Sequence, residues 1–276
     1  MQHRADILEF GICWLTLIQA DLLELVELSA RHGFTTLSIG PQQYLDSLEA
    51  GETQASVRRR LNDAGVKIAF LDAVVTGLPG LPRAAPPTDI STCLHVACCL
   101  DAPLINVAHY KGGEVAADAL IAGVAQFCET AAQDGVSIAL EPIAGTGFPD
   151  LAATQAIIEA SGQPNCGIMF DPTHWARANG TLADIQSLRP GIITGFQLCD
   201  RTKPAPGVAP VPMAGRDLPG EGELPLWQIT EAVLANNPAL TIELEVLSEE
   251  LQAMTAAEAA ARCVSAMQNW QTLRPG

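Results

Sequence analysis

Four apolar runs in the second half of the chain each end in a side chain that can bind a cation. The runs are VSIALEPI, CGIMFDPTH, ITGFQLCD and ALTIELEVL, and the side chains are Glu141, Asp171, Gln197 and Glu245. Such apolar runs are expected to be buried strands, and a buried carboxylate is costly unless it is paired or binds a cation. The pattern therefore predicts one divalent metal site. Its oxygen-rich ligands favour Mn²⁺ or Mg²⁺, with Zn²⁺ or Co²⁺ as alternatives.

The last of these runs offers two carboxylates, Glu243 and Glu245. They lie on the same face of a strand, about 6–7 Å apart, so either could be the ligand. Glu245 is nearer the carboxyl end of the strand and is the preferred ligand. Glu243 could instead be a carboxylate held by a neighbouring polar group, or a supporting residue beneath the metal.

Short apolar runs alternate with amphipathic stretches along the whole chain. Strands are expected at residues 8–12, 35–39, 67–75, 104–109, 136–143, 166–171, 192–200 and 240–247. Helices are expected at 20–32, 55–64, 89–100, 115–133, 151–161, 181–188, 225–236 and 256–270. Parallel strands joined by helical crossovers form either a closed barrel or a doubly wound sheet. Eight units favour an α/β protein with a (β/α)8 TIM barrel, formed by residues 1–276 as a single domain.

Several function classes lose support from what the sequence lacks. No GxGxxG follows the first strand and no GxxxxGK[ST] occurs, which argues against dinucleotide and P-loop sites. The net charge of −16 repels nucleic acid and anionic membranes. We find no membrane-length apolar run and no signal peptide, and we expect a cytoplasmic protein. Eight cysteines without a CxxC motif are typical of reduced, buried thiols.

Four more side chains near the expected strand ends could contact a substrate. His174 could complete the metal shell, hold a substrate hydroxyl or transfer a proton, or could be a loop histidine bonded to backbone. His109 ends the fourth strand, and Trp14 could stack on a sugar or ring, or simply pack. Arg216 lies in the long segment 201–222, which we interpret as an active-site loop. It could close over the substrate or be a solvated charge.

Motifs along nearly the whole chain resemble the sugar phosphate isomerase/epimerase superfamily, the xylose isomerase-like TIM barrels. They are LELVELSARHGFTTLSI, IALEPI, IMFDPTHWARANG, FQLCDRTKP, GRDLPGEGELPL and ELEVLS. The resemblance implies a metal held by Glu141, Asp171, Gln197 and Glu245, with His174 close by. It also favours Glu245 over Glu243.

The chain departs from the epimerase pattern at Gln197, where many relatives have histidine. Glutamine in a segment such as FQLCD resembles the 3-dehydroshikimate dehydratases of the same superfamily. Those enzymes carry a histidine in the loop after strand five, whereas this chain has AGTGFPD with Phe148. Endonuclease IV, a three-zinc relative, is disfavoured because five histidines cannot readily supply its site and the charge is acidic.

Three hypotheses follow for the function. The first is an isomerase or epimerase that moves a proton next to a carbonyl through a metal-stabilised enediolate, with Glu141 and Glu245 as the proton-transferring groups and His174 stabilising oxygen charge. The second is a lyase that eliminates a hydroxyl by the same enolate chemistry. The third is a non-catalytic sugar-binding barrel. Few basic residues lie near strand ends, so a neutral sugar or cyclic hydroxyketone is the expected partner, and the sequence permits a homodimer.

Overall fold

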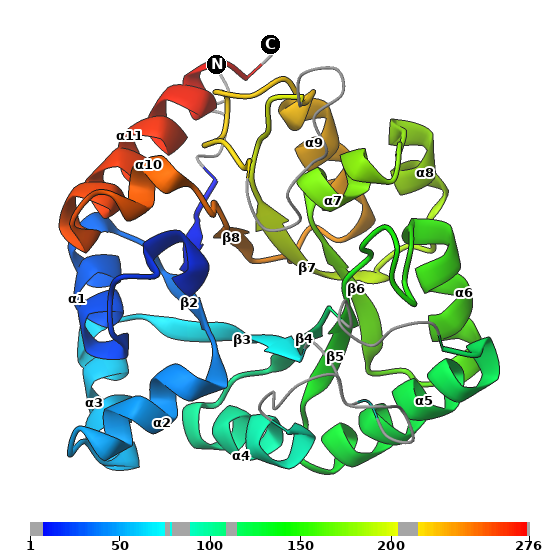
Figure 1. Cartoon of the computed structure of the whole chain (residues 1–276), viewed down its shortest axis with the longest axis horizontal. Helices are drawn as coiled ribbons and strands as arrows, with labels where there is room; N and C mark the ends of the chain where they lie inside the picture. The colour runs from blue at the N-terminus through cyan, green and yellow to red at the C-terminus, as the bar shows by residue number, and fades with distance from the viewer. Residues whose placement is uncertain (1–7, 75–77, 79–88, 109–114, 204–214, 275–276) are drawn as a thin grey trace, which may run out of the picture.

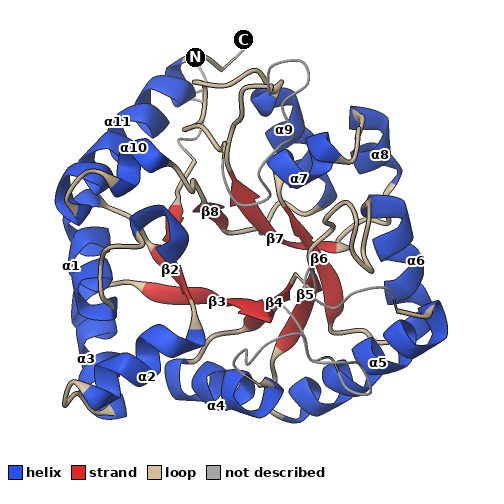
Figure 2. Cartoon of the chain, viewed as in Figure 1, coloured by secondary structure: helices blue, strands red, loops and turns tan. Residues whose placement is uncertain are grey.

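Eight parallel strands pair in chain order and close into a barrel surrounded by helices (Figures 1 and 2). The computed structural model describes residues 8–74, 78, 89–108, 115–203 and 215–274. The strands are β1 (Gly11–Cys13), β2 (Thr36–Ile39), β3 (Lys67–Val74), β4 (Leu104–Val107), β5 (Ser137–Leu140), β6 (Cys166–Phe170), β7 (Ile193–Leu198) and β8 (Ile242–Leu244). The predicted (β/α)8 barrel is confirmed. The strands are mostly shorter than expected because flanking apolar residues continue beyond the paired backbone.

The principal helices follow the predicted order. They are α1 (Leu22–His32), α3 (Gln54–Ala64), α4 (Ile90–Leu100), α5 (Ala117–Gln133), α6 (Leu151–Ser161), α8 (Leu182–Ser187), α9 (Leu226–Asn236) and α11 (Ala256–Thr272). Local sequence sets many of their ends. Asp21, for example, caps α1 by accepting a hydrogen bond from the Glu24 amide at 2.8 Å, and Gly33 ends it with a φ of +80°.

Four short helical segments were not predicted. They are η1 (Trp14–Leu17), α2 (Pro41–Glu49), α7 (Pro172–Arg177) and α10 (Glu249–Gln252). Each lies in the connection that follows a strand, and most are too short for an apolar repeat to reveal them. For α2 a usable signal existed, because Pro41 at its first position is a common way to begin a helix.

The side chains inside the barrel form an apolar layer beneath a polar one. The apolar layer includes a buried cluster of Phe70, Leu104, Ala139 and Met169. Two positions further along the same strands come Asp72, Asn106, Glu141 and Asp171, all at most 5% exposed. Because strand side chains alternate between faces, these polar residues point to the same interior near the carboxyl ends of the strands. Intervening residues such as Leu71 and Phe170 pack in the main core.

Glu243 occupies a different place inside the barrel from Glu245. Its strand pairs with β1 so that Glu243 lies beside Gly11, and Thr36 of β2 donates a hydrogen bond to its carboxylate. Glu243 is completely buried. Gly11 leaves the space that the Glu243 carboxylate and the Thr36 hydroxyl fill.

None of the helices in the described ranges is long and apolar enough to cross a membrane. All eight cysteines lie in those ranges as thiols outside any disulfide bond, and Cys98 alone among them is exposed. His109 lies outside the described residues, so its predicted contact with substrate stays a prediction.

The contact around Gly11 predicts a specific loss of stability. A Cβ at Gly11 would overlap both the completely buried Glu243 carboxylate and the hydroxyl of the half-buried Thr36. Gly11→Ala should lower the free energy of unfolding by about 1–3 kcal/mol, measured by urea denaturation. In the control Gly40→Ala, the new Cβ would have its nearest neighbours at 3.4 Å. Equal stability of the two variants would contradict the crowding at Gly11.

Candidate active site

The four predicted metal ligands lie at the carboxyl ends of their strands. Glu141, Asp171 and Glu245 each follow the last residue of β5, β6 and β8, and Gln197 is the penultimate residue of β7. All four are at most 5% exposed. This is the end of a TIM barrel at which active sites are found.

Sequence reasoning missed Asp72 and Cys13, which belong to the same polar ring. Asp72 is 4% exposed and lies within β3, and Cys13 is the last residue of β1. A signal for Asp72 was available, because it is the acidic residue that interrupts the apolar run KIAFLDAVV. Its spacing from Phe70 is the same as that of Glu141 from Ala139.

Asn106 joins two of the carboxylates. Its Nδ2 donates to Asp72 Oδ1 and to Glu141 Oε2, both at 2.8 Å. Gln197 Nε2 also approaches Asp72 Oδ1, at 3.4 Å. The oxygen of the Gln197 amide is buried and has no hydrogen-bond partner among the described residues. The amide groups thus orient the acids, and the buried oxygens of Asn106 and Gln197 both remain without a hydrogen-bond partner among the described residues.

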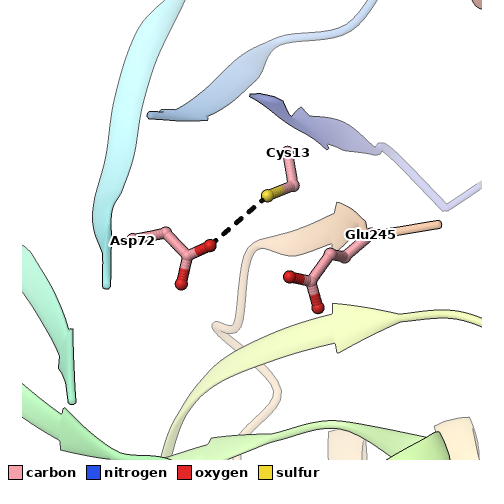
Figure 3. Close-up of side chains that lie close together, drawn as sticks. All are labelled: Cys13, Asp72 and Glu245. Carbon is pink, nitrogen blue, oxygen red and sulfur yellow. Dashed lines mark hydrogen bonds between the residues drawn. The ribbon is translucent and has the colours of Figure 1, made fainter. Parts of the chain in front are cut away.

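A second group of side chains gathers around Asp72 on the other side of the ring. Cys13, Asp72 and Glu245 point toward one another, with Cys13 Sγ 3.6 Å from Asp72 Oδ2 (Figure 3). One ligand atom from each lies within 4.8 Å of the others, and the same holds for Glu141, Asp171 and His174. The predicted carboxylate ligands are therefore divided between two neighbouring groups, with Glu245 in the first and Glu141 and Asp171 in the second. Gln197, the fourth predicted ligand, is bonded to Asp72 of the first group.

Asp171 orients His174 through the start of α7. Its Oδ1 accepts a hydrogen bond from the His174 amide at 2.9 Å, which is helix N-capping. The imidazole is 4% exposed, and its Nε2 lies 3.4 Å from Glu141 Oε1. The ring of His174, and not only its backbone, therefore lies in the polar site.

Arg216 is buried among the acids rather than solvated. It is 3% exposed, and its Nη2 lies 2.6 Å from Asp171 Oδ2 and 3.4 Å from Glu245 Oε2. The same Nη2 is 3.2 Å from His174 Nε2. The solvated alternative for Arg216 is wrong, because three buried groups surround its guanidinium.

Asp200 anchors the segment that carries Arg216. Asp200 and Asp217 exchange two backbone hydrogen bonds of 2.9 and 2.8 Å. The Asp200 carboxylate also accepts hydrogen bonds from the amides of Gly220 and Leu224, both at 3.1 Å. Arg216 precedes this bridge directly, so the anchor fixes where its side chain enters the barrel.

Thr16 fixes the backbone around Glu245 by two hydrogen bonds. Its hydroxyl donates to the Leu244 carbonyl and accepts from the Val246 amide, both at 2.9 Å. These are the peptide groups on either side of Glu245. The η1 segment therefore fixes the backbone that presents this carboxylate, although β8 itself has ended.

Burial and neighbouring charges shift the pKa values of the carboxylates in the polar ring. Burial, followed by the charges of Asp72 and Asp171, raises the pKa of Glu141 to about 8. Burial and neighbouring acids also raise the pKa of Glu245, despite Arg216. For Asp171, burial opposes ionisation, but Arg216 and His174 outweigh it and lower its pKa. Asp171 is thus the carboxylate most strongly held as an anion.

The pKa of His174 moves in the opposite direction. Burial, helped by Arg216, lowers it to about 4, although Asp171 opposes the shift. A neutral imidazole has a lone pair on one nitrogen, and Arg216 Nη2 lies where it can donate to Nε2. His174 is therefore neutral near neutral pH and suited to accept a hydrogen bond there.

A cavity of about 830 Å³ opens onto these groups. Asp72, Glu141, His174, Arg216 and Glu245 line its inner end. Trp14 also lines it, and its indole nitrogen donates to the Asp72 carbonyl at 3.3 Å. Glu243 does not line the cavity. The structure thus brings Trp14 and Arg216 to the predicted site, and their contact with a substrate stays a prediction.

The family description of xylose isomerase-like TIM barrel matches residues 26–267. A comparison with curated proteins finds no significant match. Among solved structures, the chain is similar to the IolI protein with a bound zinc atom, at 14% identity and a TM-score of 0.84, covering 98% of this chain and 100% of that one.

Two further solved structures are similar in fold. The probable 3-DHS dehydratase AsbF of Bacillus anthracis has 16% identity and a TM-score of 0.71, over 92% of this chain and 98% of that one. The D-psicose 3-epimerase of Clostridium cellulolyticum H10, solved with D-tagatose, has 15% identity and a TM-score of 0.69, over 98% and 100%.

The raised pKa of Glu243 predicts that the stability of the folded protein depends on pH. Burial raises its pKa to about 8 against the opposing hydrogen bond from Thr36. Between pH 4.5 and 8 the folded protein retains a proton that the unfolded chain releases, so stability falls as pH rises through this window. Glu243→Gln removes this proton, and relative to wild type it should gain up to about 1.4 kcal/mol per pH unit.

The measurement is urea unfolding of both proteins at intervals from pH 5 to pH 8.5. The exposed carboxylate of α10 provides a control, because Glu249→Gln should follow the wild-type pH profile. Parallel profiles for wild type and Glu243→Gln would contradict the assignment of a buried proton to Glu243.

Proposed function

Because this chain belongs to the xylose isomerase-like TIM barrel family, we propose that it is a divalent-metal-dependent isomerase or epimerase of a sugar or related hydroxyketone. The observation that carries the proposal is the ring of buried carboxylates at one end of the cavity. Burial of so many acids is costly for stability alone, and it is more readily explained by chemistry.

The donors at this end of the cavity fit a cation. Glu141, Asp171, Gln197 and Glu245 would hold it. The buried Gln197 Oε1 has no hydrogen-bond partner in the described part of the chain, and Glu245 Oε2 lies 3.4 Å from Arg216 Nη2. Oxygen donors favour Mn²⁺ or Mg²⁺, and the zinc of the similar IolI structure keeps Zn²⁺ and Co²⁺ as alternatives. A bound cation would supply Lewis acidity toward a carbonyl and an adjacent hydroxyl.

Glu245 is the better candidate than Glu243 for the last ligand. Glu245 shares the cavity with Glu141 and lies beside Arg216, whereas Glu243 is bonded to Thr36 deeper in the barrel. Glu243 then has the supporting role that the sequence left open for it.

Proton transfer falls to Glu141 and Glu245. They lie on strands β5 and β8, which two other strands separate, so they approach the cavity from different sides. One carboxylate would remove the proton next to the carbonyl and the other would return it. His174 and Arg216 would bind the oxygens on which negative charge develops.

A lyase remains the second candidate, and Gln197 is the observation that favours it. The similar AsbF structure is described as a probable 3-DHS dehydratase. Against it, Phe148 is completely buried in the loop where the dehydratases carry a histidine. His174 is the imidazole closest to Glu141 in the described site, at 3.4 Å. Elimination of a hydroxyl would need His174 to donate a proton to the leaving oxygen.

Replacing Glu141 should abolish the reaction without unfolding the protein. Glu141→Gln keeps the shape but removes the base, and we expect exchange of solvent deuterium into D-tagatose or D-fructose to fall by about 10²–10⁴-fold. The exposed Glu159→Gln on α6 is the matched control and should retain exchange. Exchange at the wild-type rate in Glu141→Gln would sink the proposed role. Conversion of 3-dehydroshikimate to an aromatic product, followed by ultraviolet absorbance, would assign the lyase instead.

Metal binding provides a test that does not depend on turnover. Calorimetric titration of the metal-free chain with Mn²⁺ should find one site, weakened at least about tenfold by Asp171→Asn or Glu245→Gln. Glu243→Gln should bind Mn²⁺ as wild type does, because its carboxylate is bonded to Thr36 and lies beside Gly11. The reverse order, with Glu243→Gln defective and Glu245→Gln normal, would assign the ligand to Glu243.

A further inference from the structure

The cavity continues well beyond the carboxylate ring into an apolar arm. Its walls come from the segment that contains η1 and the start of α1 on one side, and from α2 on the other. Apolar residues of these walls include Trp14, Leu15, Ile18, Leu22, Pro41 and Ala50. We use "apolar arm" for the part of the cavity that these six residues line. The whole cavity is large for a small hydroxyketone, since volumes of about 300–1,000 Å³ hold drug-sized ligands.

Ile18 is an unusual residue in this arm because it is exposed. Among the described residues, Ile18 at 44% and Leu273 at 62% are the large hydrophobic side chains that remain exposed. Leu273 follows α11 and does not line the cavity. Ile18 does line it, so its apolar surface is directed to a space that a ligand can enter.

Trp14 separates the arm from the reacting end and is held in place. Its indole nitrogen donates to the Asp72 carbonyl at 3.3 Å. Its ring also packs against Gly40, where an added Cβ would lie 3.4 Å from the ring carbons. The indole is therefore a fixed apolar wall rather than a mobile surface side chain, and a flat apolar group can pack on such a wall at little entropic cost.

The charges around the arm disfavour an anionic ligand. Asp21, Asp46 and Glu52 line this part of the cavity, and no lysine or arginine of the described lining residues lies there. Arg216 lines the inner end rather than the arm, and its Nη2 is engaged by Asp171 and Glu245. A phosphate in the arm would meet these acidic side chains and, among the described residues that line the arm, no basic partner.

We propose that the apolar arm binds an uncharged apolar or aromatic substituent of the substrate. The substrate class is thus a neutral hydroxyketone with such a substituent, and not a sugar phosphate. This assignment rests on the proposed function, because it places the reacting carbons at Glu141 and Glu245 and the substituent beyond Trp14. Ile18 then acts as a specificity-determining residue that contacts the substituent.

Two neutral probes that differ by one ring test the arm directly. Hydroxyacetone carries the reacting group alone, and 1-hydroxy-3-phenoxypropan-2-one adds a phenyl ether. Binding of each to the full chain with Mg²⁺ is measured by ligand-observed NMR titration. Burial of the phenyl ring should make the second probe bind roughly ten- to hundredfold tighter. Dihydroxyacetone phosphate should bind no tighter than hydroxyacetone.

Substitution of Ile18 identifies where the phenyl group binds. Ile18→Gln should reduce the preference for the phenoxy probe at least about threefold while leaving hydroxyacetone binding unchanged. Leu273→Gln is the matched control, because it changes the other exposed hydrophobic residue and should leave the preference intact. Deuterium exchange into both probes, recorded in the same samples, reports the reaction separately from binding.

The outcomes separate the arm from the reaction. A phenoxy preference that Ile18→Gln reduces supports the arm, even if no probe exchanges deuterium and the proposed reaction fails. Exchange without a phenoxy preference overturns the arm and leaves the reaction standing. Tighter binding of dihydroxyacetone phosphate overturns it as well. Dissociation of a dimer by Ile18→Gln, seen by size-exclusion chromatography, would make the arm a subunit interface and also overturn the proposal.

Discussion

Burial of carboxylates inside the barrel is the constraint on which the rest of this structure depends. Asp72, Glu141, Asp171, Glu243 and Glu245 are each at most 5% exposed. Desolvation of each acid opposes its ionisation, and for Glu141 and Glu245 the neighbouring acids oppose it further. The five acids have different stabilising partners. Arg216 stabilises the Asp171 anion, amide groups orient Asp72 and Glu141, and Thr36 bonds Glu243.

These partners arrive from distant parts of the chain because the barrel gathers strand ends around one axis. Arg216 reaches Asp171 only because the Asp200–Asp217 bridge turns its segment toward the strands. Thr16 holds the backbone around Glu245 from the opposite end of the sequence. The polar ring is therefore built by connections after the strands, while the apolar layer below it gives the strands a fixed register. Such a division suits a site whose chemistry varies on a constant scaffold.

The proposed acid–base chemistry and the proposed ligand recognition occupy different parts of one cavity. The inner end holds groups with shifted pKa values, including Glu141 and His174. The outer part offers a fixed indole at Trp14 and the exposed surface of Ile18. A substrate that spans both parts would use apolar contacts to place its reacting carbon among the carboxylates, and orientation of this kind contributes substantially to catalysis.

The sequence by itself determined the barrel and the position of the four predicted ligands at strand ends, because both follow from local patterns. Apolar runs and helix signals repeat eight times, and alternation along a strand places Glu141 two positions after Ala139 on the same face. Tertiary structure alone decided that Arg216 is buried, that Asp72 is bonded to Asn106 and Gln197, and that Glu243 and Glu245 have different neighbours. Those facts depend on strand register and on hydrogen bonds between residues far apart in the chain, which no local periodicity encodes.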